Sequence, residues 1–99
     1  MNITDAIRAA IKDKQIVKFT YEGRTRISEP HVLGIKNGVI ELLMYQIGGQ
    51  SSSGGLPDWR RVKVSKIQDF QIINETFEGK RATKTGQHSD FDTLIEIVG

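Results

Sequence analysis

IKNGVIELLMYQ, residues 35–46, is the stretch that decides the fold of this chain. Asn37 and Gly38 separate two apolar runs, and both residues tolerate a positive φ angle, so this pair is the strongest local signal for a β-hairpin turn. The strand expected after the turn, from Val39 to Gln46, is apolar on both faces. A strand of this kind lies in the centre of a sheet, and we expect a helix to cover one of its sides.

Further strands are predicted on both sides of this hairpin. Residues 17–21 alternate between apolar and polar side chains, which is the two-residue period of a half-buried strand. Residues 25–35 are also predicted to be extended, and Pro30 requires an edge or a bulge there because proline cannot donate a hydrogen bond to a ladder. Residues 59–64 and 70–73 supply two more strands, which makes five in all.

Helical periods occur at the two ends of the chain. Residues 4–14 are predicted to form a helix that Thr4 can cap, because Ile3, Ile7, Ala10 and Ile11 form one apolar stripe. After a polar stretch at residues 78–90, four apolar side chains follow the period of a second, short helix: Phe91, Leu94, Ile95 and Val98. We therefore expect a mainly β, α+β protein. An N-terminal helix would cover a small, strongly bent five-stranded barrel in residues 1–77, and residues 78–99 would form a linker and a short C-terminal helix that packs on the body or on a partner.

The composition is ordinary for a soluble globular protein, with 37% hydrophobic and 26% charged residues. Ninety-nine residues make one domain. The chain has no cysteine, so neither disulfides nor thiolate chemistry can contribute. The first helical segment is charged and no apolar run is long enough to cross a membrane, so we expect a cytoplasmic protein with no membrane association.

The segment after the central strand combines flexible backbone, one aromatic side chain and several cations. Residues 48–55 are almost entirely glycine and serine, and the only tryptophan, Trp59, follows them. Arg60, Arg61 and Lys63 come next. The Gly/Ser loop could point backbone amides at a phosphate, but it lacks the order of a nucleotide triphosphate loop, and a flexible hairpin connection remains the simpler interpretation.

On a strand, Arg61 and Lys63 point to the same side, and we expect Arg26 to lie on the neighbouring extended segment. Three cations beside Tyr21 or Trp59 would suit a phosphate-rich ligand with a base that can stack. The alternative is a solvated strand face whose charges keep the sheet edge soluble.

Two further groups of polar residues carry weaker chemical signals. Glu29 and His31 flank Pro30; we expect them to be poor acid–base partners and expect Glu29 to pair with an arginine. Residues 88–92 contain His, Ser and two Asp side chains, which capping of a helix explains better than a metal or a triad does. No metal site and no catalytic residues are predicted.

Several of these segments resemble the WYL domain family. The resemblance is carried by Tyr21-Glu-Gly, by Arg26-Ile-Ser-Glu-Pro and by VKVSKI at residues 62–67, and it spans residues 3–73. YQIGGQSSSG and PDWR, within residues 45–60, are similar to a compact standalone branch of that family. The naming tripeptide itself is replaced by Ile-Glu-Leu at residues 40–42, and lysines replace the closing arginines at positions 63 and 66.

The resemblance implies an Sm-like, SH3-type barrel, and the family pattern places Arg26 near the face that Arg61 and Lys63 share. WYL domains usually follow a helix-turn-helix in bacterial transcription factors, where they act as sensors, and some bind nucleic acid through basic residues on the barrel. This chain has no room for a helix-turn-helix, so a role in transcription regulation would need a partner that supplies the DNA contact.

The sequence thus predicts a non-enzymatic ligand-sensing or nucleic-acid-binding module that needs no cofactor. Its ligand would be a single-stranded nucleic acid or a nucleotide-like anion, and the predicted ligand-binding residues are Tyr21, Arg26, Trp59, Arg60, Arg61 and Lys63. The alternative is a structural module that forms homo-oligomers through barrel edges and the C-terminal tail.

Overall fold

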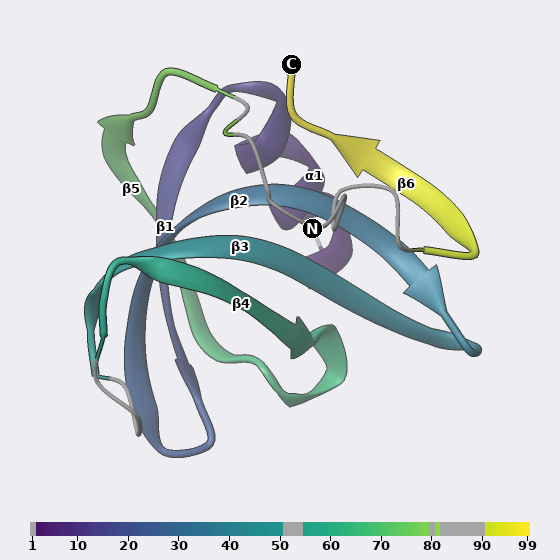
Figure 1. Ribbon diagram of the computed structural model, residues 1–99, viewed down its shortest axis with the longest axis horizontal. Coiled ribbons are helices and arrows are strands. Elements are labelled where there is room, and N and C mark those ends of the chain that lie inside the picture. Colours follow the sequence, from purple (N-terminus) through teal and green to yellow (C-terminus); the bar gives the residue numbers. More distant parts are fainter. Residues whose placement is uncertain (1, 51–54, 80, 82–90) are drawn as a thin grey trace.

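The computed structural model describes residues 2–50, 55–79, 81 and 91–99. It is mainly β, with one N-terminal helix and six antiparallel strands in a strongly curved sheet (Figure 1). The elements follow in the order α1 (Ile3–Lys12), β1 (Gln15–Tyr21), β2 (Arg24–Lys36), β3 (Val39–Gly49), β4 (Asp58–Lys63), a 3-10 turn (Val64–Lys66), β5 (Gln68–Thr76) and β6 (Thr93–Ile97).

The predicted hairpin joins β2 to β3. Asn37 and Gly38 have φ angles of 51° and 77°, and Lys36 is paired with Val39 on the other side of the turn. β3 pairs with β2 on one side and with β4 on the other, so it is the interior strand that the sequence predicted.

Pro30 lies where β2 changes its partner. Along one edge of β2, residues 24–28 pair with β1 and residues 32–35 pair with β6. Along the other edge, the register with β3 shifts between Pro30 and Val32, so His31 is the extra residue of a bulge. The predicted need for a bulge at Pro30 is confirmed, because a residue without an N–H falls at a gap in the ladder.

The main core lies between α1 and one face of the sheet, which we call the inner face. Ile7, Ala10 and Ile11 are fully buried there, so the predicted apolar stripe of the helix is confirmed. They pack with inner-face side chains such as Phe19 and Leu42. The helix begins one residue earlier than predicted and its cap is Asn2, whose side chain accepts the N–H of Asp5, so the assignment of the cap to Thr4 was wrong.

The C-terminal helix predicted from the spacing of Phe91, Leu94, Ile95 and Val98 is wrong, because residues 93–97 form the strand β6. This strand takes the part of β2 that β1 leaves unpaired, and it lies along the end of β2 in Figure 1. Pairing supplies backbone hydrogen bonds to a segment too short to be a stable helix alone. The sheet therefore has six strands rather than five.

The paired ladder runs in the order β4-β3-β2-β1-β5, so β4 and β5 are its two ends. One side-chain contact reaches across the curve of the sheet. The backbone N–H of Lys63, at the end of β4, donates to the hydroxyl of Tyr21, at the end of β1, with a distance of 3.1 Å.

Candidate anion-binding site

The register of β4 on β3 separates the predicted site residues between the two faces of the sheet. Val62 is buried in the main core, so Trp59, Arg61 and Lys63 lie on the opposite face, which we call the outer face. The prediction that Arg61 and Lys63 share a face is confirmed. Arg60 alternates with these residues and so points to the same face as Val62. It lies near the start of β4, and its side chain is 21% exposed.

A hollow of about 270 Å³ lies along β4 and is lined by Leu43, Trp59, Arg60 and Arg61. Three of these four residues were predicted from the sequence to bind a ligand. The hollow combines one aromatic residue, the apolar side chain of Leu43 and two arginines. These are the groups that hold a base by stacking and a phosphate by charge-assisted hydrogen bonds.

Trp59 forms one wall of this hollow and is itself held by two aromatic neighbours. Its ring makes edge-to-face contacts with His31 and Tyr45, at centroid distances of 4.8 and 5.2 Å. Trp59 is half-buried, and these ring contacts fix its position beside the hollow.

Arg61 extends from β4 across β3. Its Nε and Nη2 atoms lie 3.1 and 3.0 Å from Oε1 of Glu41. Its guanidinium lies 4.1 Å from the ring centroid of Phe91, a residue of the C-terminal segment. An ion pair and a cation–π contact thus hold this cation, and sequence inspection anticipated neither partner.

Arg60 is held by a carboxylate close to it in the chain. Its Nη1 atom donates to Asp58 at 2.8 Å and to the carbonyl of Trp59 at 3.0 Å. The hydrogen bond from Arg60 and a second one from the N–H of Trp59 hold the pKa of Asp58 below its ordinary value. The carboxylate therefore stays charged and keeps the guanidinium beside the hollow.

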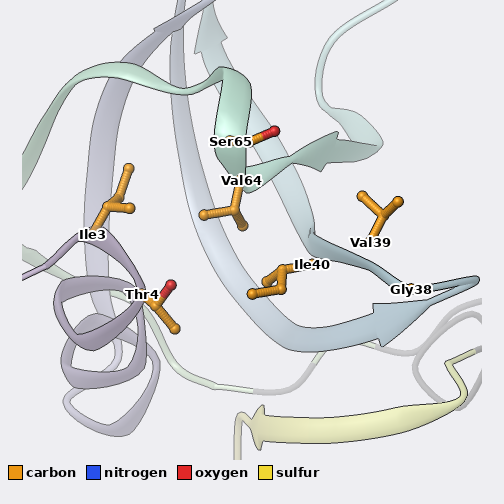
Figure 2. A pocket seen from close by; sticks show the side chains of 7 residues that line it. All are labelled: Ile3, Thr4, Gly38, Val39, Ile40, Val64 and Ser65. Atoms are coloured by element: carbon orange, nitrogen blue, oxygen red, sulfur yellow. The ribbon is translucent and has the colours of Figure 1, made fainter.

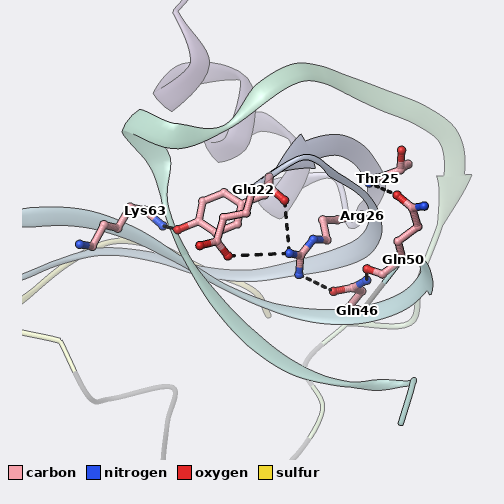
Figure 3. Close-up of polar contacts among 7 residues, drawn as sticks. Glu22, Thr25, Arg26, Gln46, Gln50 and Lys63 are labelled. Carbon is pink, nitrogen blue, oxygen red and sulfur yellow. Dashed lines mark hydrogen bonds and ion pairs between the residues drawn. The ribbon is translucent and has the colours of Figure 1, made fainter. Parts of the chain in front are cut away.

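Arg26 does not join the cations of the outer face. It pairs with Phe19 across β1 and is only 6% exposed, so it lies on the inner face. Its nitrogens donate to Gln46 at 3.4 Å and to the carbonyl of Tyr21 at 3.3 Å, and the carboxylate of Glu22 lies 4.0 Å away (Figure 3). Burial lowers the pKa of Arg26, and the charges of Arg24 and Arg60 lower it further.

A buried arginine with long hydrogen bonds of this kind has a structural role at this end of the sheet. Its guanidinium also lies 5.6 Å from the centroid of the Tyr21 ring. Tyr21 is buried as well, and its hydroxyl accepts the N–H of Lys63. The structure therefore separates the sequence-predicted set into an inner pair, Arg26 and Tyr21, and a group along β4.

Glu29, on the outer face of β2, has the arginine partner that the sequence predicted. Arg81 donates to both of its carboxylate oxygens, at 2.7 and 3.1 Å, and stacks on Tyr45 with its guanidinium 4.5 Å from the ring centroid. This hydrogen bonding raises the pKa of Arg81. Glu29 and His31 lie on one face, and Nε2 is 3.6 Å from Oε1, which is longer than a hydrogen bond; that they are poor acid–base partners stays a prediction.

A second hollow, of about 450 Å³, lies near the start of α1 and the hairpin turn (Figure 2). It is lined by Ile3, Thr4, Gly38, Val39, Ile40, Val64 and Ser65. Most of this lining is apolar and it includes no charged group, so it does not offer the chemistry of an anion site.

Several expectations concern residues beyond the described ones. Residues 51–54 of the Gly/Ser loop and most of the His88–Asp92 cluster fall outside them. Within the described ranges, no group of three or more His, Asp or Glu side chains is arranged to hold a metal. In the same part of the chain, no helix is long and apolar enough to cross a membrane.

The geometry thus brings together Trp59, Arg60 and Arg61 around one hollow, with Lys63 exposed further along the same strand. Sequence reasoning missed Glu41 and Phe91 as partners of Arg61, and it predicted an arginine partner for Glu29 without identifying it as Arg81. Comparison of the chain with models of known protein families, with curated proteins and with solved structures finds no match.

Proposed function

We propose that this protein is a non-enzymatic binding module for an anionic ligand that carries a base, namely single-stranded nucleic acid or a nucleotide-like anion. The observation that carries the proposal is the hollow along β4 with its lining of Trp59, Arg60 and Arg61. A base would stack against the exposed part of Trp59, and the guanidinium groups would receive its phosphate.

The pairing of both arginines with carboxylates supports a preorganised site of modest affinity. A guanidinium has five N–H donors in a rigid fork, so one group can bond a carboxylate and a phosphate at the same time. Asp58 and Glu41 fix the orientation of the two forks, but they also offset their charge. We therefore expect few released counterions and a shallow dependence of affinity on salt.

We further propose that the curved sheet is an SH3/Sm-like barrel and that the chain is a divergent relative of WYL domains with a regulatory role. The strand order β4-β3-β2-β1-β5 supports this proposal, because it makes β4 and β5 the two strands that closure would join. The contact between Lys63 and Tyr21 supports it too, since it links strands that are not neighbours in the ladder.

The test of the binding proposal is a fluorescence anisotropy titration of short labelled oligothymidylate and oligouridylate at two salt concentrations. Arg60→Gln and Arg61→Gln should each weaken binding and reduce the salt slope by about 0.7, the value for one phosphate contact on a single strand. Lys18→Ala is the matched control, because it removes an exposed positive charge from β1, away from the hollow. Equal affinities for all four proteins would refute the proposed site.

Assembly into homo-oligomers is a second candidate, and the composition of β6 favours it. This strand pairs only with β2 among the described strands, and Leu94 and Ile97 on it are 48% and 39% exposed. An edge strand with exposed apolar side chains can pair with a second copy. Light scattering should then show a mass that rises with concentration and falls in Ile97→Lys; a constant monomer mass would exclude this candidate.

A further inference from the structure

Phe91 occupies a place on the outer face that only a glycine leaves open. A Cβ atom built on Gly34 would lie 2.6 Å from Cδ1 of Phe91 and 2.7 Å from the carbonyl oxygen of Thr93. The ring therefore rests directly on the backbone of β2 at Gly34. Asp92 fixes the same segment, because its N–H donates to Ile35 O at 2.8 Å and its carboxylate accepts the N–H of Asn37 at 2.7 Å.

The position of Phe91 sets the position of the Arg61 guanidinium. On the outer face, Arg61 pairs with Leu43 of β3, and Glu41 of the same strand pairs with Gly34 of β2. To reach Glu41 and the Phe91 ring, the Arg61 side chain must cross β3 toward β2. Arg61 is thus a residue that lines the hollow and whose guanidinium contacts both Glu41 and the C-terminal segment.

We infer that Phe91 is an intramolecular competitor for Arg61 at the proposed ligand site. This inference rests on the proposed function. The ring of Phe91 covers the guanidinium as a stacked base would, so the ligand must replace this contact to engage the charged end of Arg61. The C-terminal segment thus lowers the affinity of the hollow, and any event that lifts Phe91 from Gly34 raises it.

Substitutions at two positions, Phe91 and Gly34, should release Arg61 from this contact. Phe91→Ala removes the ring, and Phe91→Leu keeps apolar bulk on Gly34 but removes the π face. Gly34→Ala displaces the Phe91 ring from the β2 side, because the new methyl group and the ring cannot occupy the same place. Ile72→Ala is the matched control, since Ile72 is an exposed apolar residue of β5, an end strand that pairs with β1.

The experiment is the same oligothymidylate titration, with thermal unfolding used to establish that each variant is folded. Phe91→Ala and Phe91→Leu should bind about fivefold more tightly than the unaltered protein, the equivalent of a lost cation–π contact of about 1 kcal/mol. Gly34→Ala should shift the affinity in the same direction, and Ile72→Ala should leave it unchanged. If Phe91→Ala fails to fold, Phe91→Leu decides.

The possible failures are distinguishable. If the unaltered protein binds and the Phe91 variants bind equally or more weakly, competition is refuted while the proposed function stands. If neither the unaltered protein nor any Phe91 variant binds, the proposed function fails and the inference fails with it. Binding that appears only in the Phe91 variants would support both.

Discussion

The guanidinium of Arg81 donates two hydrogen bonds to the carboxylate of Glu29, across 52 residues of the chain. Glu29 is 4% exposed on the outer face of β2. Arg81 therefore brings the chain that follows β5 back onto the outer face beside Tyr45 and Trp59. A buried carboxylate that depends on one arginine makes this pair a sensitive point of the fold.

Removal of Arg81 should destabilise the protein. Arg81→Ala leaves the buried Glu29 carboxylate without its two charge-assisted hydrogen bonds. We expect the free energy of unfolding, measured in urea titrations, to fall by about 2 kcal/mol. The loss is not larger because Arg81 itself is half exposed, so solvent already screens its charge. Glu29→Gln combined with Arg81→Ala should lose less than the sum of the single variants. Additive losses would contradict a direct pairing.

The difference in burial between two residues of β3 leads to a second prediction about stability. Leu42 is fully buried, whereas Ile40, two residues away on the same strand, is 36% exposed. Leu42→Ala should lower the free energy of unfolding by about 3 kcal/mol, since it opens a cavity in the main core, and Ile40→Ala should cost less than about 1 kcal/mol. Similar losses at both positions would contradict the burial difference between these two residues of the inner face.

Tyr21→Phe tests the contact that spans the curve of the sheet. The substitution keeps the ring and removes only the hydroxyl that accepts the N–H of Lys63. We expect a loss of about 1 kcal/mol in the free energy of unfolding, and faster hydrogen exchange at the Lys63 amide. An unchanged exchange rate at that amide would mean that the hydrogen bond does not form.

A fall in pH should weaken the ion pair between Asp58 and Arg60 beside the hollow. Hydrogen bonds in the folded state lower the pKa of Asp58. The carboxylate therefore stabilises the fold fully at any pH above the pKa that Asp58 has in the unfolded chain. This stabilisation is lost as the pH falls through the lowered pKa of the folded state. In an NMR titration, the Asp58 carboxyl should have a midpoint below its ordinary value. Arg60→Gln should move that midpoint upward; an unchanged midpoint would contradict the role of Arg60.

The strands and the hairpin could be predicted because their signals are local. Asn37-Gly38 carries its own turn chemistry, and the bulge at Pro30 follows from a missing N–H. β6 could not be predicted in this way. The spacing of its apolar residues fits a helix, and the strand forms because residues 32–35 of β2 are left unpaired by β1, which is a property of the tertiary structure.

Only the part of the candidate site that lies on a single strand, β4, could be predicted from the sequence. Alternation along β4 places Arg61 and Lys63 together, but the face of Arg26 depends on its register with Phe19. A shift of one residue in register exchanges the two faces, and no local signal fixes it for residues 24–28. The contact of Phe91 with Arg61 is equally remote, since it requires the docking of the C-terminal segment.

The most direct test of the central claim is an NMR titration of the isotope-labelled protein with oligothymidylate, followed at the indole N–H of Trp59. The chain has one tryptophan, so this resonance reports on the hollow alone. A saturable shift of the indole signal and of the β4 amides, with the α1 amides unchanged, is the predicted result. An indole resonance that stays fixed while the oligonucleotide binds elsewhere, or does not bind at all, would contradict the proposed site.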